Sequence, residues 1–212
     1  MSYITVLPSP LQTAYRDWLG GQTETQQAER LRLAEEGQAP PAMIIACCDS
    51  RLPSSDLFGG ETGSSFIHRN VANLVPPPDA DGLGETAAAV EYAVKQLKVA
   101  HLIVLGHSKC GGVQGCLDMN MKGKDALPFD YVPQWVSVLT PAFEKKQSEG
   151  DVDAKMLEQA GIVMSLENLL QYPYVKQACE AGALSLHGLW FDISDASLHT
   201  YDKDNNCFKL VE

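Results

Sequence analysis

Five polar residues in two short segments have the types and spacing needed for metal chemistry. Cys47, Asp49 and Arg51 occupy alternate positions in the first segment, and His107 and Cys110 are three apart in the second. Two thiolates and one imidazole are ligands that zinc favours. A structural zinc site normally has four protein ligands, whereas a catalytic site keeps one position for water. The sequence therefore predicts a zinc site with Cys47, His107 and Cys110 as its ligands.

Asp49 decides between these two kinds of site. Its carboxylate can be a fourth ligand, or it can be paired with Arg51 and held away from the metal. A bidentate bridge to Arg51 would leave the carboxylate free to accept one further hydrogen bond. A plain salt bridge that stabilises a turn is an equally good interpretation of the two residues. The residue types alone leave all three interpretations open.

Both segments follow short apolar runs, over residues 42–48 and 101–106, that are typical of buried strands. A further strand is expected over residues 66–70, and the spacing of apolar residues predicts a helix over 85–98. A strand, a helix and a strand in this order indicate a parallel sheet. The carboxyl ends of parallel strands share one edge, where ligands bind in open α/β sheets. We therefore expect the two polar segments to meet there.

The rest of the chain predicts more helices and a few more strands. Two helices separated by Gly20 and Gly21 are expected over residues 9–36, the second beginning at Thr23. A helix over 157–170, a strand over 184–193 and a terminal hairpin near 204–206 are expected further along. We expect one domain over residues 1–212. Residues 1–36 are expected to form its helical arm, residues 37–120 the core with the zinc site, and residues 121–212 helices, the edge strand and the C-terminal hairpin.

Composition excludes several classes of protein. The 16 Lys and Arg residues against 27 Asp and Glu residues give a net charge of −11, which argues against nucleic acid or an anionic membrane as partner. With 45% hydrophobic and 20% charged residues, the chain is not expected to be disordered. It lacks the ~20 consecutive apolar residues of a membrane span, and no secretory signal is expected. Six cysteines are too few for a disulfide scaffold, so a cytoplasmic protein is expected.

Four motifs together resemble the β-class carbonic anhydrases in order and spacing. They are CCDSR at 47–51, HRNVAN at 68–73, EYA at 91–93 and GHSKCGG at 106–112. The resemblance is strong over about residues 31–117, and C-x-D-x-R combined with H-x-x-C is highly specific to that family. It implies an α/β fold with a mainly parallel sheet, an antiparallel edge strand, flanking helices and an N-terminal helical arm that crosses onto a neighbouring chain. It also implies a homodimer or a dimer of dimers.

The resemblance further implies an activity and a set of site residues. The expected enzyme is a carbonic anhydrase that hydrates CO₂ reversibly to bicarbonate and a proton, using zinc-bound hydroxide oriented by Asp49 and Arg51. Asp49 is also implied as a possible fourth zinc ligand in a closed state. The residues implied to contact substrate are Gln38, Phe66, Val71, Tyr92 and Gly111.

The chain resembles the plant-like, non-cooperative branch of that family. The cooperative branch holds a second bicarbonate with a tryptophan and a tyrosine, and the corresponding positions here are Ile44 and Phe191. Arg69, which matches an arginine of that second site, is present. Cys48 stands where a small residue is usual, and we expect it to be a packed thiol.

Three other functions fit some of the same residues. A carbon disulfide or carbonyl sulfide hydrolase on the same scaffold would share the five polar site residues. A non-enzymatic zinc-stabilised protein would have Asp49 as a permanent fourth ligand. A thiol redox module is disfavoured because Cys47 and Cys48 are adjacent, whereas redox pairs usually have C-x-x-C spacing.

Overall fold

A computed structural model describes residues 6–80 and 84–212 of the chain. The chain divides into two compact units, Met1–Gln38 and Ala39–Glu212, which are described separately. The helical arm expected over residues 1–36 is thus described from residue 6 onward. None of the described helices is long and apolar enough to cross a membrane.

The N-terminal unit consists of two helices, α1 (Ser9–Gly20) and α2 (Glu24–Glu36). Thr23 caps α2: its hydroxyl accepts a hydrogen bond from the Gln26 backbone N–H, and the Gln26 side chain accepts one from the Thr23 N–H. These elements confirm the two helices expected on either side of Gly20 and Gly21. Neither helix has a buried residue, and the apolar side chains of α1 are about half exposed at Leu11, Tyr15, Trp18 and Leu19.

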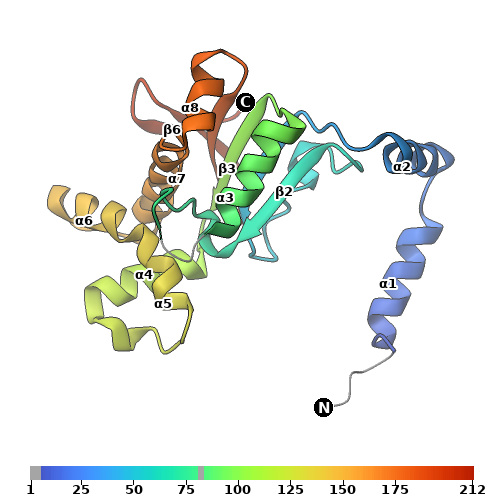
Figure 1. Ribbon diagram of the computed structural model, residues 1–212. Coiled ribbons are helices and arrows are strands. Elements are labelled where there is room, and N and C mark those ends of the chain that lie inside the picture. The colour runs from blue at the N-terminus through green and yellow to red at the C-terminus, as the bar shows by residue number, and fades with distance from the viewer. Residues whose placement is uncertain (1–5, 81–83) are drawn as a thin grey trace. The chain divides into compact units, whose positions relative to one another are not determined.

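The second unit is built on a six-stranded sheet in the order β2-β1-β3-β4-β5-β6 (Figure 1). The strands are β1 (Ala42–Cys47), β2 (Ser65–Asn70), β3 (His101–His107), β4 (Ser185–Phe191), β5 (Leu198–Asp202) and β6 (Cys207–Leu210). Strands β1 to β4 are parallel to one another, whereas β5 pairs antiparallel with β4, and β6 pairs antiparallel with β5. The expected mainly parallel sheet with an antiparallel edge is confirmed, and the C-terminal hairpin itself forms that edge.

Helices surround the sheet: α3 (Gly84–Glu91), α4 (Gly111–Lys122), α5 (Val132–Val136), α6 (Thr140–Glu149), α7 (Ala154–Leu169) and α8 (Pro173–Glu180). Short helical turns are η1 (Asp56–Phe58), η2 (Val71–Asn73), η4 (Lys124–Ala126) and η5 (Ser137–Leu139). The helix predicted over 85–98 differs in its last part. After Glu91 it continues as a π-helical segment, η3 (Tyr92–Leu97), and the Val99 N–H closes it by donating to the Ala93 carbonyl.

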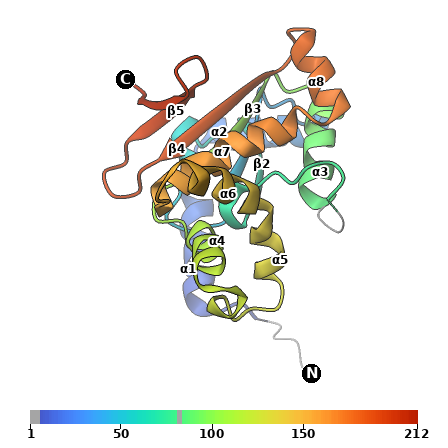
Figure 2. The same cartoon turned by 90° about the vertical axis from the view of Figure 1, so that its left-hand side faces the viewer.

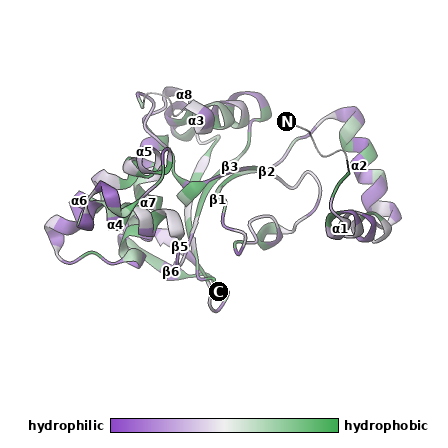
Figure 3. Ribbon diagram, turned by 90° about the horizontal axis from the view of Figure 1, so that it is seen from below, coloured by the Kyte–Doolittle hydropathy of each residue, from purple (hydrophilic) through white to green (hydrophobic). Residues whose placement is uncertain are grey.

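Two hydrophobic clusters occupy opposite faces of the sheet. Met43, Ile45, Leu102, Val104 and Trp190 point to the face covered by α3, α7 and α8. The alternate strand residues join a second cluster that includes α4, α5 and α6. Figure 2 shows α4 and α5 beyond one end of the strands, and Figure 3 shows hydrophobic residues concentrated along the strands. This packing places the carboxyl ends of β1 and β3 beside α4.

Candidate metal centre

Three ligand-type side chains meet at the carboxyl edge of the sheet, as expected from the sequence. Cys47 is the last residue of β1, His107 is the last residue of β3, and Cys110 immediately precedes α4. The strands β1 and β3 are parallel neighbours, so both end at the same edge. The ligand atoms of the three buried residues all lie within 4.8 Å of one another, and we call this group the Cys-His-Cys cluster.

The histidine of the cluster is oriented for a metal ion. His107 Nδ1 lies 2.8 Å from the Ser108 carbonyl oxygen, which fixes Nδ1 as the N–H donor and leaves a lone pair on Nε2. That Nε2 is buried and has no hydrogen-bond partner among the described residues. A buried nitrogen without a partner is costly, and a metal ion would remove this cost. The imidazole therefore fits a metal ligand better than a core residue.

The two sulfur atoms of the cluster favour a bound cation for an electrostatic reason. The Sγ atoms of Cys47 and Cys110 lie 3.8 Å apart. The hydrogen bond from the Cys110 thiol lowers the pKa of Cys47, whereas the same contact and burial raise the pKa of Cys110. One sulfur thus ionises readily, and a second adjacent thiolate requires a neighbouring positive charge. Two thiolates with one imidazole form a donor set that fits zinc.

Asp49 lies next to the cluster and is bound to Arg51. Arg51 donates to the Asp49 carboxylate from Nε to Oδ1 at 2.9 Å and from Nη2 to Oδ2 at 2.6 Å, and its backbone N–H also donates to Oδ1. Arg51 holds the pKa of Asp49 well below its usual range, so the carboxylate is ionised. Asp49 Oδ2 lies 3.9 Å from His107 Nε2. The structure therefore has Asp49 in its Arg51-bound position, beside the atoms that would hold the metal.

Two arginines connect the loop after β1 to its surroundings. Arg51 Nη2 also donates to the Lys109 carbonyl oxygen at 3.1 Å, which joins this loop to the one between His107 and Cys110. Arg69 of β2 donates to the carbonyl oxygens of Cys47, Asp49 and Leu52. Arg69, noted in the sequence for its match to an anion site, thus donates three hydrogen bonds to this loop backbone through Nε and Nη2.

Glu158 is a site residue that the sequence reasoning missed. This carboxylate on α7 is only 4% exposed, and it accepts hydrogen bonds from the Cys110 backbone N–H and from Trp190 Nε1, both at 3.1 Å. Burial raises the pKa of Glu158, which these hydrogen bonds oppose. A signal was available: Glu158 lies four residues before Ile162, on the buried side of α7, where an acidic residue is unusual.

Phe66 and Tyr92 lie together but away from the Cys-His-Cys cluster of their own chain. Their ring centroids are 5.8 Å apart. Phe66 is paired with Met43, four residues before Cys47, so it is roughly 13 Å back along the sheet. Tyr92 is 48% exposed. These two aromatic rings therefore form a partly exposed apolar surface at the other end of the strands.

Val71 and Gly111 lie nearer to the cluster. Val71 follows β2 in the turn η2, and its carbonyl oxygen accepts a hydrogen bond of 2.7 Å from Trp135 Nε1. A Cβ atom on Gly112 would lie 2.7 Å from Val71 Cγ1, so the start of α4 packs directly against Val71. Gly111 is the first residue of α4, and the space around it is open. Gln38 is the last residue of the N-terminal unit and is described only within that unit.

The sequence model described as carbonic anhydrase matches residues 42–198 of the chain. The chain belongs to the β-carbonic anhydrase family. It is 36% identical over 181 residues to β carbonic anhydrase 5, a chloroplastic protein of Arabidopsis thaliana. This match covers 83% of the chain and 59% of that relative, so the chain spans about three fifths of the relative's length.

Solved β-carbonic anhydrases have the same fold. The structure of the β-carbonic anhydrase CcaA matches with a TM-score of 0.82 and 28% identity, covering 96% of this chain and all of that one. One of two tetrameric β-carbonic anhydrases from Sordaria macrospora matches with a TM-score of 0.79 and 29% identity, covering 94% of this chain and 96% of that one. The family's fold accordingly extends over nearly the whole chain.

One expectation about the thiols of this β-carbonic anhydrase chain is wrong. Cys48 is exposed, not packed, because it follows the buried end of β1 and its side chain points to the opposite side from Cys47. Burial raises its pKa above that of an ordinary thiol. Cys48 is therefore a surface thiol that directly follows Cys47 of the Cys-His-Cys cluster.

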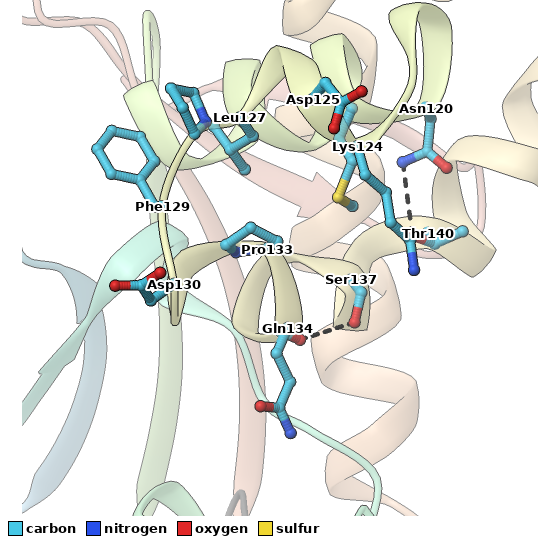
Figure 4. A pocket seen from close by; sticks show the side chains of 12 residues that line it. Asn120, Lys124, Asp125, Leu127, Phe129, Asp130, Pro133, Gln134, Ser137 and Thr140 are labelled. Atoms are coloured by element: carbon cyan, nitrogen blue, oxygen red, sulfur yellow. Dashed lines mark hydrogen bonds between the residues drawn. The ribbon is translucent and has the colours of Figure 1, made fainter.

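The second unit has a cavity away from the Cys-His-Cys cluster and another that is lined in part by Cys110. A cavity of about 880 Å³ lies between the end of α4, the turn after it and α5 (Figure 4). Asn120 and Thr140 meet across it at 3.5 Å, and the Ser137 hydroxyl donates to the Gln134 carbonyl. A second cavity of about 530 Å³ adjoins the cluster on the side of Cys110 and Glu158. Neither cavity contains Cys47, His107 or Asp49.

Proposed function

We propose that this chain catalyses the reversible hydration of CO₂ to bicarbonate and a proton, with zinc held by Cys47, His107 and Cys110. Membership of the β-carbonic anhydrase family supports the reaction class. The observation that carries the proposal is the ionised Asp49, held by Arg51 beside an unpartnered His107 Nε2. A purely structural zinc site would have no need of this arrangement.

Bound zinc would supply the Lewis acidity that makes water a nucleophile near neutral pH. Asp49 would accept a hydrogen bond from the nucleophilic water, because its carboxylate is ionised and faces the cluster. Arg51 would hold the carboxylate in this orientation through its two parallel hydrogen bonds. We propose that a closed state also exists, in which Asp49 leaves Arg51 and becomes the fourth metal ligand.

The substrate pocket would combine residues from two chains. Val71 and the Gly111 N–H would come from the same chain as the metal ligands, since both lie at the carboxyl edge of the sheet. Gln38, Phe66 and Tyr92 would come from a neighbouring chain, because Phe66 and Tyr92 lie far from their own Cys47. Apolar side chains would accept CO₂, and the Gln38 amide and Gly111 N–H would stabilise negative charge on its oxygens.

The working assembly would be a homodimer or a dimer of dimers. The exposed apolar side chains of α1 support an arm over residues 1–36 that packs on a neighbouring chain. Solved relatives from Sordaria macrospora are tetrameric. An active monomer in size-exclusion chromatography with in-line light scattering would contradict this assembly.

The plant-like, non-cooperative behaviour expected from the sequence is part of the proposal. Ile44 is fully buried in the sheet, Phe191 is 4% exposed, and Arg69 is engaged by three carbonyl oxygens. Ile44 and Phe191 have no polar side-chain atom that could bind a second bicarbonate, and Arg69 already donates three hydrogen bonds to the loop after β1. We also propose a cytoplasmic location, since all six cysteines are free thiols, which suits a reducing compartment.

The proposal is tested by measuring zinc content and CO₂ hydration of the purified chain from pH 6 to 9. One zinc per chain and rapid hydration are expected. Cys110→Ser should lose both zinc and activity, whereas Cys116→Ser, which removes a buried thiol of α4 outside the cluster, should keep both. Release of sulfide from carbonyl sulfide without CO₂ hydration would overturn the proposed substrate. A zinc-loaded chain inactive at every pH would overturn the proposed enzyme.

A further inference from the structure

Two histidines from neighbouring strands lie against each other at the opposite end of the sheet from the Cys-His-Cys cluster. His101 begins β3, and His187 lies in β4. In the parallel register His101 pairs with Ser185 and Ile103 pairs with His187, so both rings are on the same face of the sheet. His101 Nδ1 lies 3.2 Å from His187 Nε2, with the ring planes at 61°.

This pair is separate from the centre proposed to be catalytic. His101 and His107 stand at opposite ends of β3, six residues apart, so roughly 20 Å separates the two positions along the strand. The chain has 5 histidines, and the other two, His68 and His199, have different neighbours, Thr86 and Trp190. His101 and His187 therefore form a histidine pair that the proposed reaction does not use.

The spacing of the two nitrogens suits a shared metal ion. Two nitrogen ligands at about 2.0–2.1 Å from a tetrahedral ion are roughly 3.3 Å apart, and about 3.0 Å apart at neighbouring octahedral positions. The observed 3.2 Å between His101 Nδ1 and His187 Nε2 lies between these values. The backbone of the two strands thus already holds the rings at the separation that a chelated ion requires.

Both rings are also accessible to solvent, and burial affects the protonation of His187. His101 is exposed and His187 is partly exposed, so water can complete the coordination of an ion. His101 Nε2 and His187 Nδ1 make no hydrogen bond to another residue within 6–80 and 84–212. Burial and the neighbouring His101 lower the pKa of His187, which leaves a neutral ring near pH 7. A neutral ring does not have to lose a net proton to bind a metal.

We propose that His101 and His187 form a second metal site, which binds a divalent transition ion such as Ni²⁺, Cu²⁺ or Zn²⁺. His101 Nδ1 and His187 Nε2 are its two protein ligands. On binding, the hydrogen bond between the rings is replaced by two nitrogen-metal bonds, and the shared proton moves to an outer ring nitrogen. Imidazole nitrogen suits these borderline ions, whereas Mg²⁺ and Ca²⁺ prefer oxygen ligands and are not expected to bind.

The test uses Ni²⁺ as probe, because it does not oxidise thiols as Cu²⁺ can. The full-length, zinc-loaded protein is titrated with NiCl₂ by isothermal titration calorimetry, and its retention on a nickel-charged resin is measured without a tag. One Ni²⁺ per chain is expected to bind. His101→Gln and His187→Gln should each lower the affinity at least about tenfold, close to the level of the double variant.

The control is His199→Gln, which removes a histidine of the same sheet outside the pair and should leave Ni²⁺ binding unchanged. Zinc content and CO₂ hydration should be the same in all these variants, so a failure of the second site is distinguishable from a failure of the proposed function. Equal Ni²⁺ binding by the double variant would overturn the proposal, since the ion would then be bound by Cys48 or other groups. An absence of Ni²⁺ binding by the unaltered chain, or single variants that bind as it does, would also overturn it.

Discussion

Arg51 forms a bidentate ion pair with the Asp49 carboxylate, and one oxygen of that carboxylate lies 3.9 Å from His107 Nε2. The same guanidinium reaches the Lys109 carbonyl, so the pair also joins the two loops that supply the cluster. The carboxylate thus has a fixed orientation and a fixed charge next to the proposed reaction site. Removing either property should affect turnover more than metal retention.

Asp49→Asn keeps the shape of the side chain and removes its charge. We expect kcat for CO₂ hydration to fall at least about 100-fold with zinc content unchanged, because the amide cannot act as the charged acceptor. Arg51→Lys keeps a charge but loses the planar fork and should also reduce kcat. Arg32→Lys is a matched control that should leave kcat unchanged, because Arg32 forms the same bidentate ion pair with Glu29 on α2. Near-normal kcat in Asp49→Asn would contradict the orienting role.

Glu158→Gln tests whether the buried carboxylate positions Cys110. The Cys110 N–H and Trp190 Nε1 donate to different oxygens of Glu158, so in glutamine one of these donors would face the NH₂ group, which is itself a donor. We expect the zinc affinity, measured in competition with a chelator, to fall about 10–100-fold, as it does when other residues that orient metal ligands are replaced. Glu167→Gln, an exposed position on α7, should have no effect. Unchanged zinc retention, with only the thermal midpoint lowered, would show that Glu158 stabilises the fold alone.

The adjacent glycines of the GHSKCGG motif should respond differently to alanine. A Cβ on Gly112 would approach Val71 Cγ1 to 2.7 Å and the Ala72 Cβ to 3.1 Å, whereas one on Gly111 meets nothing within 4 Å. Gly112→Ala should therefore lower the free energy of unfolding by about 1–3 kcal/mol. Gly111→Ala, at the first position of α4, should be neutral or slightly stabilising. Urea denaturation of both variants measures the free energy of unfolding. An equal decrease in the two variants would refute the steric explanation.

The partly buried His68 should make stability depend on pH. Burial lowers its pKa in the folded state below the unfolded value of about 6.5. As pH falls through about 6.5, the unfolded chain takes up a proton that the folded chain does not, so stability is full above this pH and is lost below it. His68→Gln can keep the contact with Thr86 and should show a smaller fall in urea midpoint between pH 7.5 and 5.5. An identical fall in both proteins would contradict this assignment.

Local patterns in the sequence were enough to predict the Cys-His-Cys cluster and the elements that hold it. The apolar runs before Cys47 and His107 predict two buried strands, and the helix between them requires a parallel connection. These two facts already bring the ends of β1 and β3 to one edge. The pairing of Asp49 with Arg51 was also among the expected alternatives, because the residues are only two apart.

Only the tertiary structure decided which residues from distant parts of the chain meet. Glu158 reaches Cys110 because α7 packs against β3 and β4, and no local pattern specifies that docking. His101 meets His187 because β4 lies beside β3 in a register that places their rings on one face. Such contacts depend on strand order, register and helix packing, which arise from burial of apolar surface over the whole unit. The residue types were present in the sequence, but their distances were set by the fold.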